Sequence, residues 1–152
     1  MIDGSISATL NKDGFIITDF KGTSMNPLFV SGRDKVFIEK KSGSLKKGDV
    51  ALYVRSDGTH VLHRVFKAIN GVYVFWGDNH MFLEYGVTDG AVIGVAKGYY
   101  KGVKYVDFKK SFRYKLYKAF WCKYVWLRKF LHLFRRLSLK LRKGFNGKNK
   151  KK

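Results

Sequence analysis

Cysteine and proline are nearly absent from this chain, because Cys122 and Pro27 are the only ones among its 152 residues. A single cysteine excludes an internal disulfide framework and fits a reducing compartment. No apolar run reaches the roughly 18 residues that a membrane-spanning helix needs. The first thirty residues also lack the apolar stretch of a secretory signal, so we do not expect export by an N-terminal signal.

Metal-ligand patterns are missing as well. The four histidines are His60, His63, His80 and His132. They form no recognised ligand spacing with one another or with the cysteine. We therefore expect no metal site and no other cofactor.

Acidic residues are absent from the C-terminal part of the chain. Residues 1–108 carry 14 Lys and Arg against 11 Asp and Glu, whereas residues 109–152 carry 17 Lys and Arg and no acid. Most of the net charge of +20 therefore belongs to the C-terminal segment. Such asymmetry indicates an anionic partner for that segment, either phosphate-rich lipid or nucleic acid.

The first 108 residues show the pattern of a mainly β domain. Short apolar and β-branched runs alternate with glycine turns, of which Ser56-Asp57-Gly58 and Asn70-Gly71 are typical of hairpins. Strands are expected at 14–20, 35–39, 50–54, 60–66, 72–76, 91–96 and 104–108. Because the strands are short and the turns frequent, we expect a coiled or barrel-like β domain.

After about Ser111 the apolar period changes from two to nearly four. The apolar stripe is formed by Leu116, Phe120, Tyr124, Leu127, Leu131 and Phe134, with Lys and Arg largely opposite. The pattern predicts a long amphipathic helix. We therefore expect three parts: a β domain over 1–108, a basic amphipathic helix over 109–143 and a disordered basic tail over 144–152.

One polar turn, from Gly22 to Pro27, separates two apolar segments and contains Ser24. A serine in a turn usually hydrogen-bonds its own backbone, so Ser24 alone indicates no chemistry. The other candidate is His63, which strand alternation places on the same face as Val61 and Val65. On its pattern alone, His63 reads as a core histidine.

Order and spacing along the chain add to these two candidates. The segment Ser24-Met-Asn-Pro27 is followed by Gly32-Arg-Asp-Lys-Val36, Lys47-Gly-Asp-Val50, Leu62-His-Arg-Val65 and Gly77-Asp-Asn79. This series over about residues 20–97 resembles the signal peptidase I superfamily of serine peptidases, which includes the self-cleaving domains of SOS-type repressors. The resemblance implies the β domain of that superfamily, and it is nearest to small soluble variants with a histidine base and a basic, aromatic C-terminal extension.

The resemblance implies a role for four residues. Ser24 matches the nucleophile, and His63 matches the general base of the histidine branch. Asp78 matches an acid of that branch, and Glu84 lies near the position of a second acid, where aspartate is usual. Which acid orients the histidine stays open, and Gly77-Asp78-Asn79 also reads as an ordinary polar turn.

These residue types suit acyl transfer. A serine hydroxyl needs a nearby base to take its proton, and a histidine can do so near neutral pH. A carboxylate behind the histidine would hold its tautomer. Backbone N–H groups at Ser24, Thr23 and Gly22 would meet the oxyanion.

We therefore expect a serine endopeptidase that cleaves a peptide or preprotein through an acyl-enzyme on Ser24. The resemblance implies small side chains next to the scissile bond. Residues 111–143 are expected to bind an anionic membrane surface, with nucleic acid as the less favoured partner, because aromatic residues among the basic ones suit a lipid interface. This places the protein in the cytoplasm, peripheral on the inner face of the cell membrane. The alternatives are a noncatalytic membrane- or nucleic-acid-binding module with a peptidase-like fold, and a helix that simply packs on its own domain.

Overall fold

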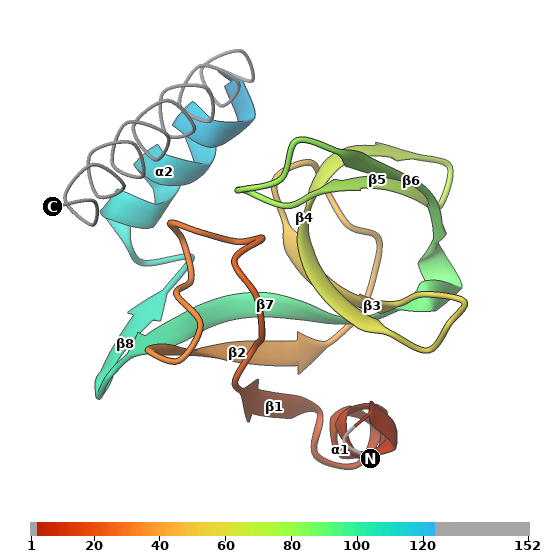
Figure 1. Ribbon diagram of the computed structural model, residues 1–152, viewed down its shortest axis with the longest axis horizontal. Helices are drawn as coiled ribbons and strands as arrows, with labels where there is room; N and C mark the ends of the chain where they lie inside the picture. Colours follow the sequence, from red (N-terminus) through yellow and green to blue (C-terminus); the bar gives the residue numbers. More distant parts are fainter. Residues whose placement is uncertain (1–2, 124–152) are drawn as a thin grey trace, which may run out of the picture.

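The computed structural model describes residues 3–123, which form a mainly β domain with a helix near each end (Figure 1). The elements are α1 (Asp3–Asp13), β1 (Phe15–Thr18), β2 (Asp34–Lys40), β3 (Val50–Val54), β4 (His60–Ile69), β5 (Val72–Trp76), β6 (Leu83–Thr88), the 3₁₀ turn η1 (Asp89–Ala91), β7 (Val92–Lys101), β8 (Lys104–Asp107) and α2 (Phe112–Lys123). All seven expected strands overlap with observed ones, so the mainly β prediction is confirmed.

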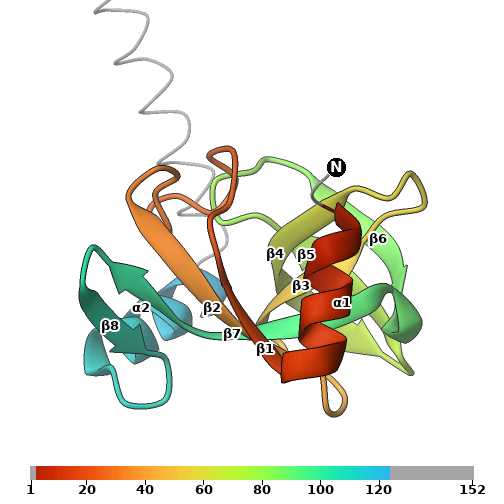
Figure 2. The same ribbon diagram turned by 90° about the horizontal axis from the view of Figure 1, so that it is seen from below.

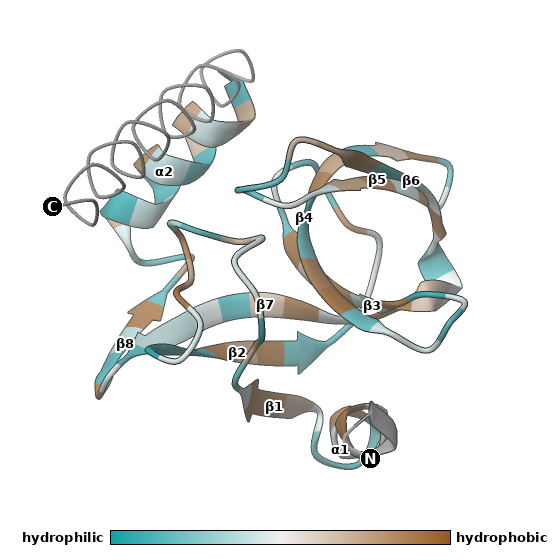
Figure 3. Ribbon diagram, viewed as in Figure 1, coloured by the Kyte–Doolittle hydropathy of each residue, from teal (hydrophilic) through white to brown (hydrophobic). Residues whose placement is uncertain are grey.

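The strands form one antiparallel sheet in the order β1-β2-β7-β3-β4-β5-β6, with β8 pairing β7. Strands β3 to β6 curl round on themselves, while β2 and β7 extend away from the curl (Figure 1). The terminal strands β1 and β6 are not paired with each other, so the sheet is coiled but does not close into a barrel. The hydropathy colouring shows apolar residues concentrated along the curled strands (Figure 3).

Two apolar clusters divide the interior. One lies where α1, the 25–29 loop and the start of α2 cover β2 and β7, and includes Leu10, Met25, Phe29, Val36, Ile38 and Tyr114. The other fills the inside of the β3–β6 curl and includes Ala51, Tyr53, Val61, Val65, Tyr73 and Phe75. The candidate site lies on strands that contribute to both clusters.

Helix α1 and strand β6 were not expected from the sequence. Leu10 of α1 is buried in the core, and Gly14 ends the helix with φ of 77° and an N–H donated to the Leu10 carbonyl at 3.2 Å. Strand β6 contains Gly86 at φ of 74°, and its register with β5 shifts between Tyr73 and Phe75. Such irregularity hides the period of two that identifies a strand.

Helix α2 confirms the predicted helix over Phe112–Lys123, and the rest of the expected 109–143 helix and 144–152 tail lies outside the described residues. Ser111 caps it by accepting the Tyr114 N–H at 3.2 Å. Tyr114 is buried and stacks on Phe108 with ring centroids 3.7 Å apart. The start of the basic segment therefore packs on the β domain, on the side away from α1 (Figure 2).

Candidate active site

The turn that contains Ser24 is anchored by the residues that follow it. Met25 and Phe29 are buried in the core, and the Phe29 N–H donates to the Met25 carbonyl at 3.1 Å. Leu28 is buried beside them. Because a polar turn is tied directly to three core side chains, Ser24 has a fixed position at the surface of that core.

A second loop holds the same turn from the other side. The Asn79 N–H donates to the Ser24 carbonyl at 2.7 Å, and its side-chain Nδ2 donates to the Thr23 carbonyl at 3.0 Å. Residues 77–79, which read as a polar turn in the sequence, therefore dock onto the serine turn. Asn79 is the member of that block that reaches Ser24.

His63 lies on the inner face of β4, where it pairs with Ala51 of β3 and is only 3% exposed. Its neighbours Val61 and Val65 belong to the cluster inside the curl, as alternation predicts. Its Nδ1 lies 3.2 Å from the phenol oxygen of Tyr53. The histidine is thus buried but has a polar partner on one ring nitrogen.

Glu84 stands behind that tyrosine. The Tyr53 hydroxyl donates to Oε2 of Glu84 at 2.7 Å, whereas the same carboxylate oxygen is 3.9 Å from His63 Nδ1. Arg55 grips Glu84 with two hydrogen bonds, from Nε at 2.7 Å and from the second guanidinium nitrogen at 2.6 Å. The expected second acid is therefore linked to the histidine through a phenol.

The other ring nitrogen of His63 faces Gly77, which also borders the backbone carbonyl of Ser24. A Cβ atom on Gly77 would fall 2.9 Å from the Ser24 carbonyl oxygen and 3.1 Å from Nε2 of His63. The same position is 3.1 Å from Cγ of His80, whose ring lies edge-on to the His63 ring at 5.1 Å. Only a residue without a side chain leaves room for these groups to converge.

Ser24, His63 and His80 line one groove of about 730 Å³. Its walls are mostly apolar, and they come from the 18–25 segment and from strands β2, β3 and β4. The apolar lining includes Phe20, Met25, Val36, Ile38, Leu52 and Leu62, with Asp19, Lys21 and Arg55 as charged members. The groove has the size of a site for a small ligand or a short peptide segment.

Asp78 serves a different partner from the one the resemblance implied. Both of its carboxylate oxygens accept from Arg64, Oδ1 at 2.8 Å and Oδ2 at 2.7 Å, and Oδ2 also accepts from Tyr117 of α2 at 2.9 Å. Arg64 follows His63 on β4, so its side chain points to the opposite face of the strand. The geometry therefore joins Asp78 to the structure beneath α2 and puts Glu84, through Tyr53, behind His63.

Burial dominates the electrostatics of the candidate base. Burial first and the nearby His80 second lower the pKa of His63 to about 4, with Glu84 acting in the opposite sense. Hydrogen bonds from Arg55 and Tyr53 keep the pKa of Glu84 below its usual value. Burial and the bond to Glu84 raise the pKa of Tyr53 well above its usual value. Near neutral pH, His63 is thus an uncharged imidazole, Tyr53 a neutral phenol and Glu84 a carboxylate.

The N–H groups proposed for the oxyanion lie in the same turn. Within residues 3–123, the backbone N–H groups of Gly22, Thr23 and Ser24 donate to no other group. Gly22 has φ of 92°, a conformation that suits glycine. These donors are therefore available to a bound carbonyl oxygen.

Sequence reasoning missed Tyr53, Arg55 and His80. Tyr53 stands on β3, and Arg55 directly follows the end of that strand, next to a recognisable Ser-Asp-Gly hairpin that fixes the register of β3 on β4. That register and strand alternation place Tyr53 on the face of His63, and Arg55 reaches the same region through its hydrogen bonds to Glu84. The signal was present in the hairpin, but an aromatic residue in an apolar strand reads as ordinary core.

Two structural absences apply to the described part of the chain. Residues 3–123 contain no group of three or more His, Cys, Asp or Glu side chains placed to hold a metal ion. Over the same range, no helix is both long and apolar enough to cross a bilayer.

Comparison with known protein families, with curated proteins and with solved structures finds no match.

Proposed function

We propose that this protein is a serine endopeptidase of the signal peptidase I type, with Ser24 as nucleophile and His63 as general base. The observation that carries the proposal is that the Ser24 carbonyl and Nε2 of His63 both border Gly77, while Ser24 and His63 line the same groove. The ordered sequence blocks that resemble the superfamily support it independently. The coiled antiparallel sheet is consistent with a peptidase domain of that kind.

The chemistry follows from this arrangement. Nε2 of His63 takes the proton of the Ser24 hydroxyl as Oγ bonds to the substrate carbonyl carbon. The oxyanion that forms is met by backbone N–H groups of the 22–24 turn. His63 then gives its proton to the departing amine, the C–N bond breaks, and water hydrolyses the acyl-enzyme with His63 again as the base.

The groove favours an extended peptide as substrate. Its wall includes the segment from Thr18 to Ser24, which continues from β1. Among residues 3–123, strand β1 ends the sheet order and pairs only with β2, so its other edge would accept a further strand. Apolar substrate side chains would fill the apolar lining, and the preference for small ones next to the scissile bond rests on the resemblance.

A fluorophosphonate probe tests the mechanism without knowledge of the substrate. We expect covalent labelling at Ser24, located by mass spectrometry, that is lost in Ser24→Ala and in His63→Gln. Ser42→Ala, a serine in an exposed loop, is the matched control and should label like the wild type. Wild-type protein that is folded by circular dichroism but unlabelled from pH 5 to 9 would contradict the proposal and favour a noncatalytic binding module.

We also propose that α2 attaches the protein to an anionic lipid surface. Phe112, Leu116 and Phe120 recur every fourth residue and are 71%, 56% and 44% exposed, while the opposite side of the helix packs on the domain through Tyr114. Basic residues stand between them, and the segment from 109 onward has no acid. An exposed apolar stripe flanked by cations suits the boundary of an anionic bilayer better than a nucleic acid, which offers it nothing apolar.

Liposome flotation tests this attachment. The full chain should float with phosphatidylglycerol-containing vesicles, and replacing Phe112, Leu116 and Phe120 by serine should abolish flotation at physiological salt. The control replaces Ile69 and Val103 by serine. These side chains lie outside α2 and are 50% and 100% exposed, and the control should float like the wild type. Unchanged flotation of the triple variant, or binding to duplex DNA at matched salt without flotation, would overturn the proposal.

A further inference from the structure

Tyr53 occupies the space between the candidate base and the acid. Its hydroxyl donates to Glu84 Oε2 at 2.7 Å, and a hydroxyl has one proton to donate. The same oxygen lies 3.2 Å from His63 Nδ1 and can therefore only accept there. The arrangement requires the proton on Nδ1, which leaves Nε2 as the unprotonated acceptor on the Ser24 side.

Glu84 does not fill this position directly. Its Oε2 is 3.9 Å from His63 Nδ1, beyond hydrogen-bond range. Arg55 holds both carboxylate oxygens at 2.6 and 2.7 Å, so Glu84 is fixed where it accepts the hydrogen bond from Tyr53. The negative charge of the Glu84 carboxylate thus sets the direction of the hydrogen bonds in the series Glu84–Tyr53–His63.

We propose that Tyr53 is a positioning residue that joins Glu84 to His63 and selects the histidine tautomer able to accept the Ser24 proton. The inference rests on the proposed function for its catalytic meaning, but the tautomer itself does not depend on it. The acid of this site is then Glu84 and not Asp78, and it acts on His63 through the neutral phenol of Tyr53. No proton leaves Tyr53 during the reaction, because its role is to orient the imidazole and stabilise it while it is protonated.

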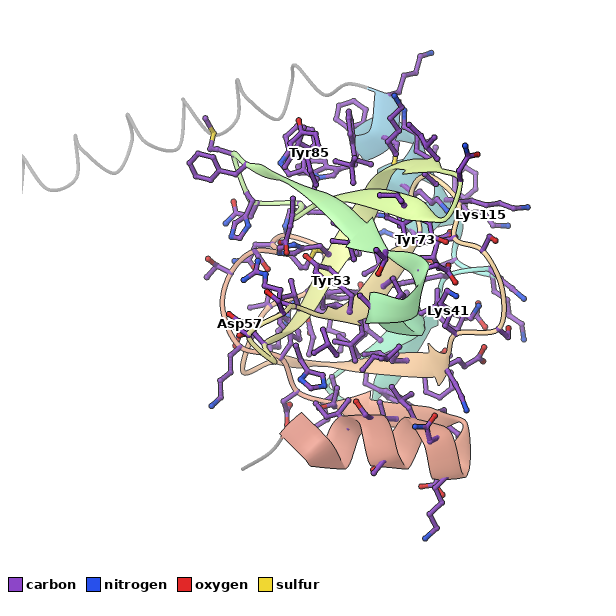
Figure 4. All side chains as sticks on the ribbon, turned by 90° about the vertical axis from the view of Figure 1, so that its right-hand side faces the viewer. Lys41, Tyr53, Asp57, Tyr73, Tyr85 and Lys115 are labelled. Atoms are coloured by element: carbon purple, nitrogen blue, oxygen red, sulfur yellow. The ribbon has the colours of Figure 1, made fainter. Side chains whose placement is uncertain are left out.

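The chain supplies a matched control. Tyr73 is also buried inside the β3–β6 curl and also donates to a carboxylate, that of Asp89, at 2.6 Å. Both tyrosines pack on Phe75, with ring centroids 4.4 Å away for Tyr53 and 6.1 Å for Tyr73. Figure 4 shows both inside the sheet, while Tyr85 lies near the outer edge. Tyr53→Phe and Tyr73→Phe therefore remove the same group from similar surroundings, and only the first touches His63.

Two readouts test the inference on the full chain. The ¹⁵N chemical shifts of the His63 ring at pH 7 report which nitrogen carries the proton, and the rate of Ser24 labelling by a fluorophosphonate reports reactivity. In wild type and Tyr73→Phe, we expect Nδ1 protonated and full labelling. In Tyr53→Phe and Glu84→Gln, we expect a mixed tautomer and a maximal labelling rate about 10- to 100-fold lower, with probe affinity unchanged, the effect of losing one charge-assisted hydrogen bond.

The outcomes separate this inference from the proposed function. If His63 keeps its wild-type tautomer populations in Tyr53→Phe, the role proposed for Tyr53 is overturned, whatever the labelling rate. A tautomer that shifts as expected in a protein that is never labelled supports the positioning role and overturns the peptidase. Equal losses of labelling in Tyr53→Phe and Tyr73→Phe would show a general effect of packing and would also overturn the inference.

Discussion

Arg64 and Asp78 form a bidentate ion pair beneath α2, with N–O distances of 2.8 and 2.7 Å. The two residues are 1% and 0% exposed, so neither charge is solvated. Arg64 also donates to the Gly48 carbonyl at 2.9 Å, and Tyr117 of α2 donates to Asp78. The pair therefore links β4, the 77–80 loop and the C-terminal helix at one point.

Removing one member of this pair should lower the stability of the fold and leave the reactivity of Ser24 unchanged. Asp78→Asn keeps the shape of the side chain but leaves Arg64 as an uncompensated buried charge. We expect the free energy of unfolding to fall by about 3–5 kcal/mol, measured by urea denaturation. At a temperature where the variant is still folded, Ser24 labelling should proceed at close to the wild-type rate.

Glu39→Gln is the control for this prediction. Glu39 pairs with Lys97 at 3.8 Å on the surface, where both side chains are at least a third exposed. Loss of such a pair changes stability by about 0.5 kcal/mol or less. If Asp78→Asn were as stable as Glu39→Gln but were not labelled at Ser24, Asp78 would be the acid of the site and the assignment to Glu84 would be wrong.

Regular strands were predictable from the sequence because their pattern is local. The apolar run of Val50–Val54, the hairpin at Asp57-Gly58 and the returning strand from His60 are all recognised from neighbouring residues. Helix α1 was missed because its apolar contact with the core depends on few residues, chiefly Leu10, among polar ones. The first contacts of α2 with the domain were left open, because a tyrosine such as Tyr114 suits a lipid interface and a protein core equally well.

The candidate site was only partly predictable for a related reason. Ser24 and His63 were singled out, and the structure brings them to one groove. The partners of Asp78 and Glu84 were not predicted, because the role of a carboxylate depends on which cation or phenol the fold places within about 3 Å of its oxygens. Asp78 pairs with Arg64 of β4, and Glu84 pairs with Arg55 in the turn after β3, so both pairs depend on sheet register.

Stability should depend on pH through the burial of His63. Its pKa of about 4 in the folded protein lies below the ordinary value near 6.5, so between these values the unfolded chain binds a proton that the folded one does not. Stability is therefore full above about pH 6.5 and is lost as the pH falls towards 4. The loss is about 2 kcal/mol by pH 5 and about 3 kcal/mol in full.

The measurement compares urea unfolding of wild type and His63→Gln between pH 7 and 5. Carboxylates such as Glu84, whose folded-state pKa is lowered, act in the same direction but mainly below about pH 5. His80, also with a lowered pKa, remains in both proteins and cancels in the comparison. We expect the wild type to lose about 2 kcal/mol more than the variant over this range. Parallel curves would mean that His63 is not buried in its uncharged form.

Gly77 should be required for reactivity at Ser24. In Gly77→Ala the new methyl group would lie 2.9 Å from the Ser24 carbonyl oxygen and 3.1 Å from His63 Nε2, so the serine turn and the histidine must move apart. Contacts this close require the neighbours to give by a few tenths of an ångström, and a misplacement near 1 Å at reacting groups lowers rates by about 100-fold. We expect the fluorophosphonate labelling rate to fall by at least tenfold, while the midpoint of urea unfolding changes little because the turn lies at the edge of the core.

Gly90→Ala is the control for this effect. Gly90 has no atom within 4 Å of the position of an added Cβ and does not adopt a positive φ, so the substitution introduces a methyl group without a clash. It should label at the wild-type rate. Full reactivity of Gly77→Ala would show that Ser24 and His63 need not converge at Gly77, and the geometric basis for their pairing would fall. Loss in Gly77→Ala alone would place the reacting groups at the position that the glycine keeps open.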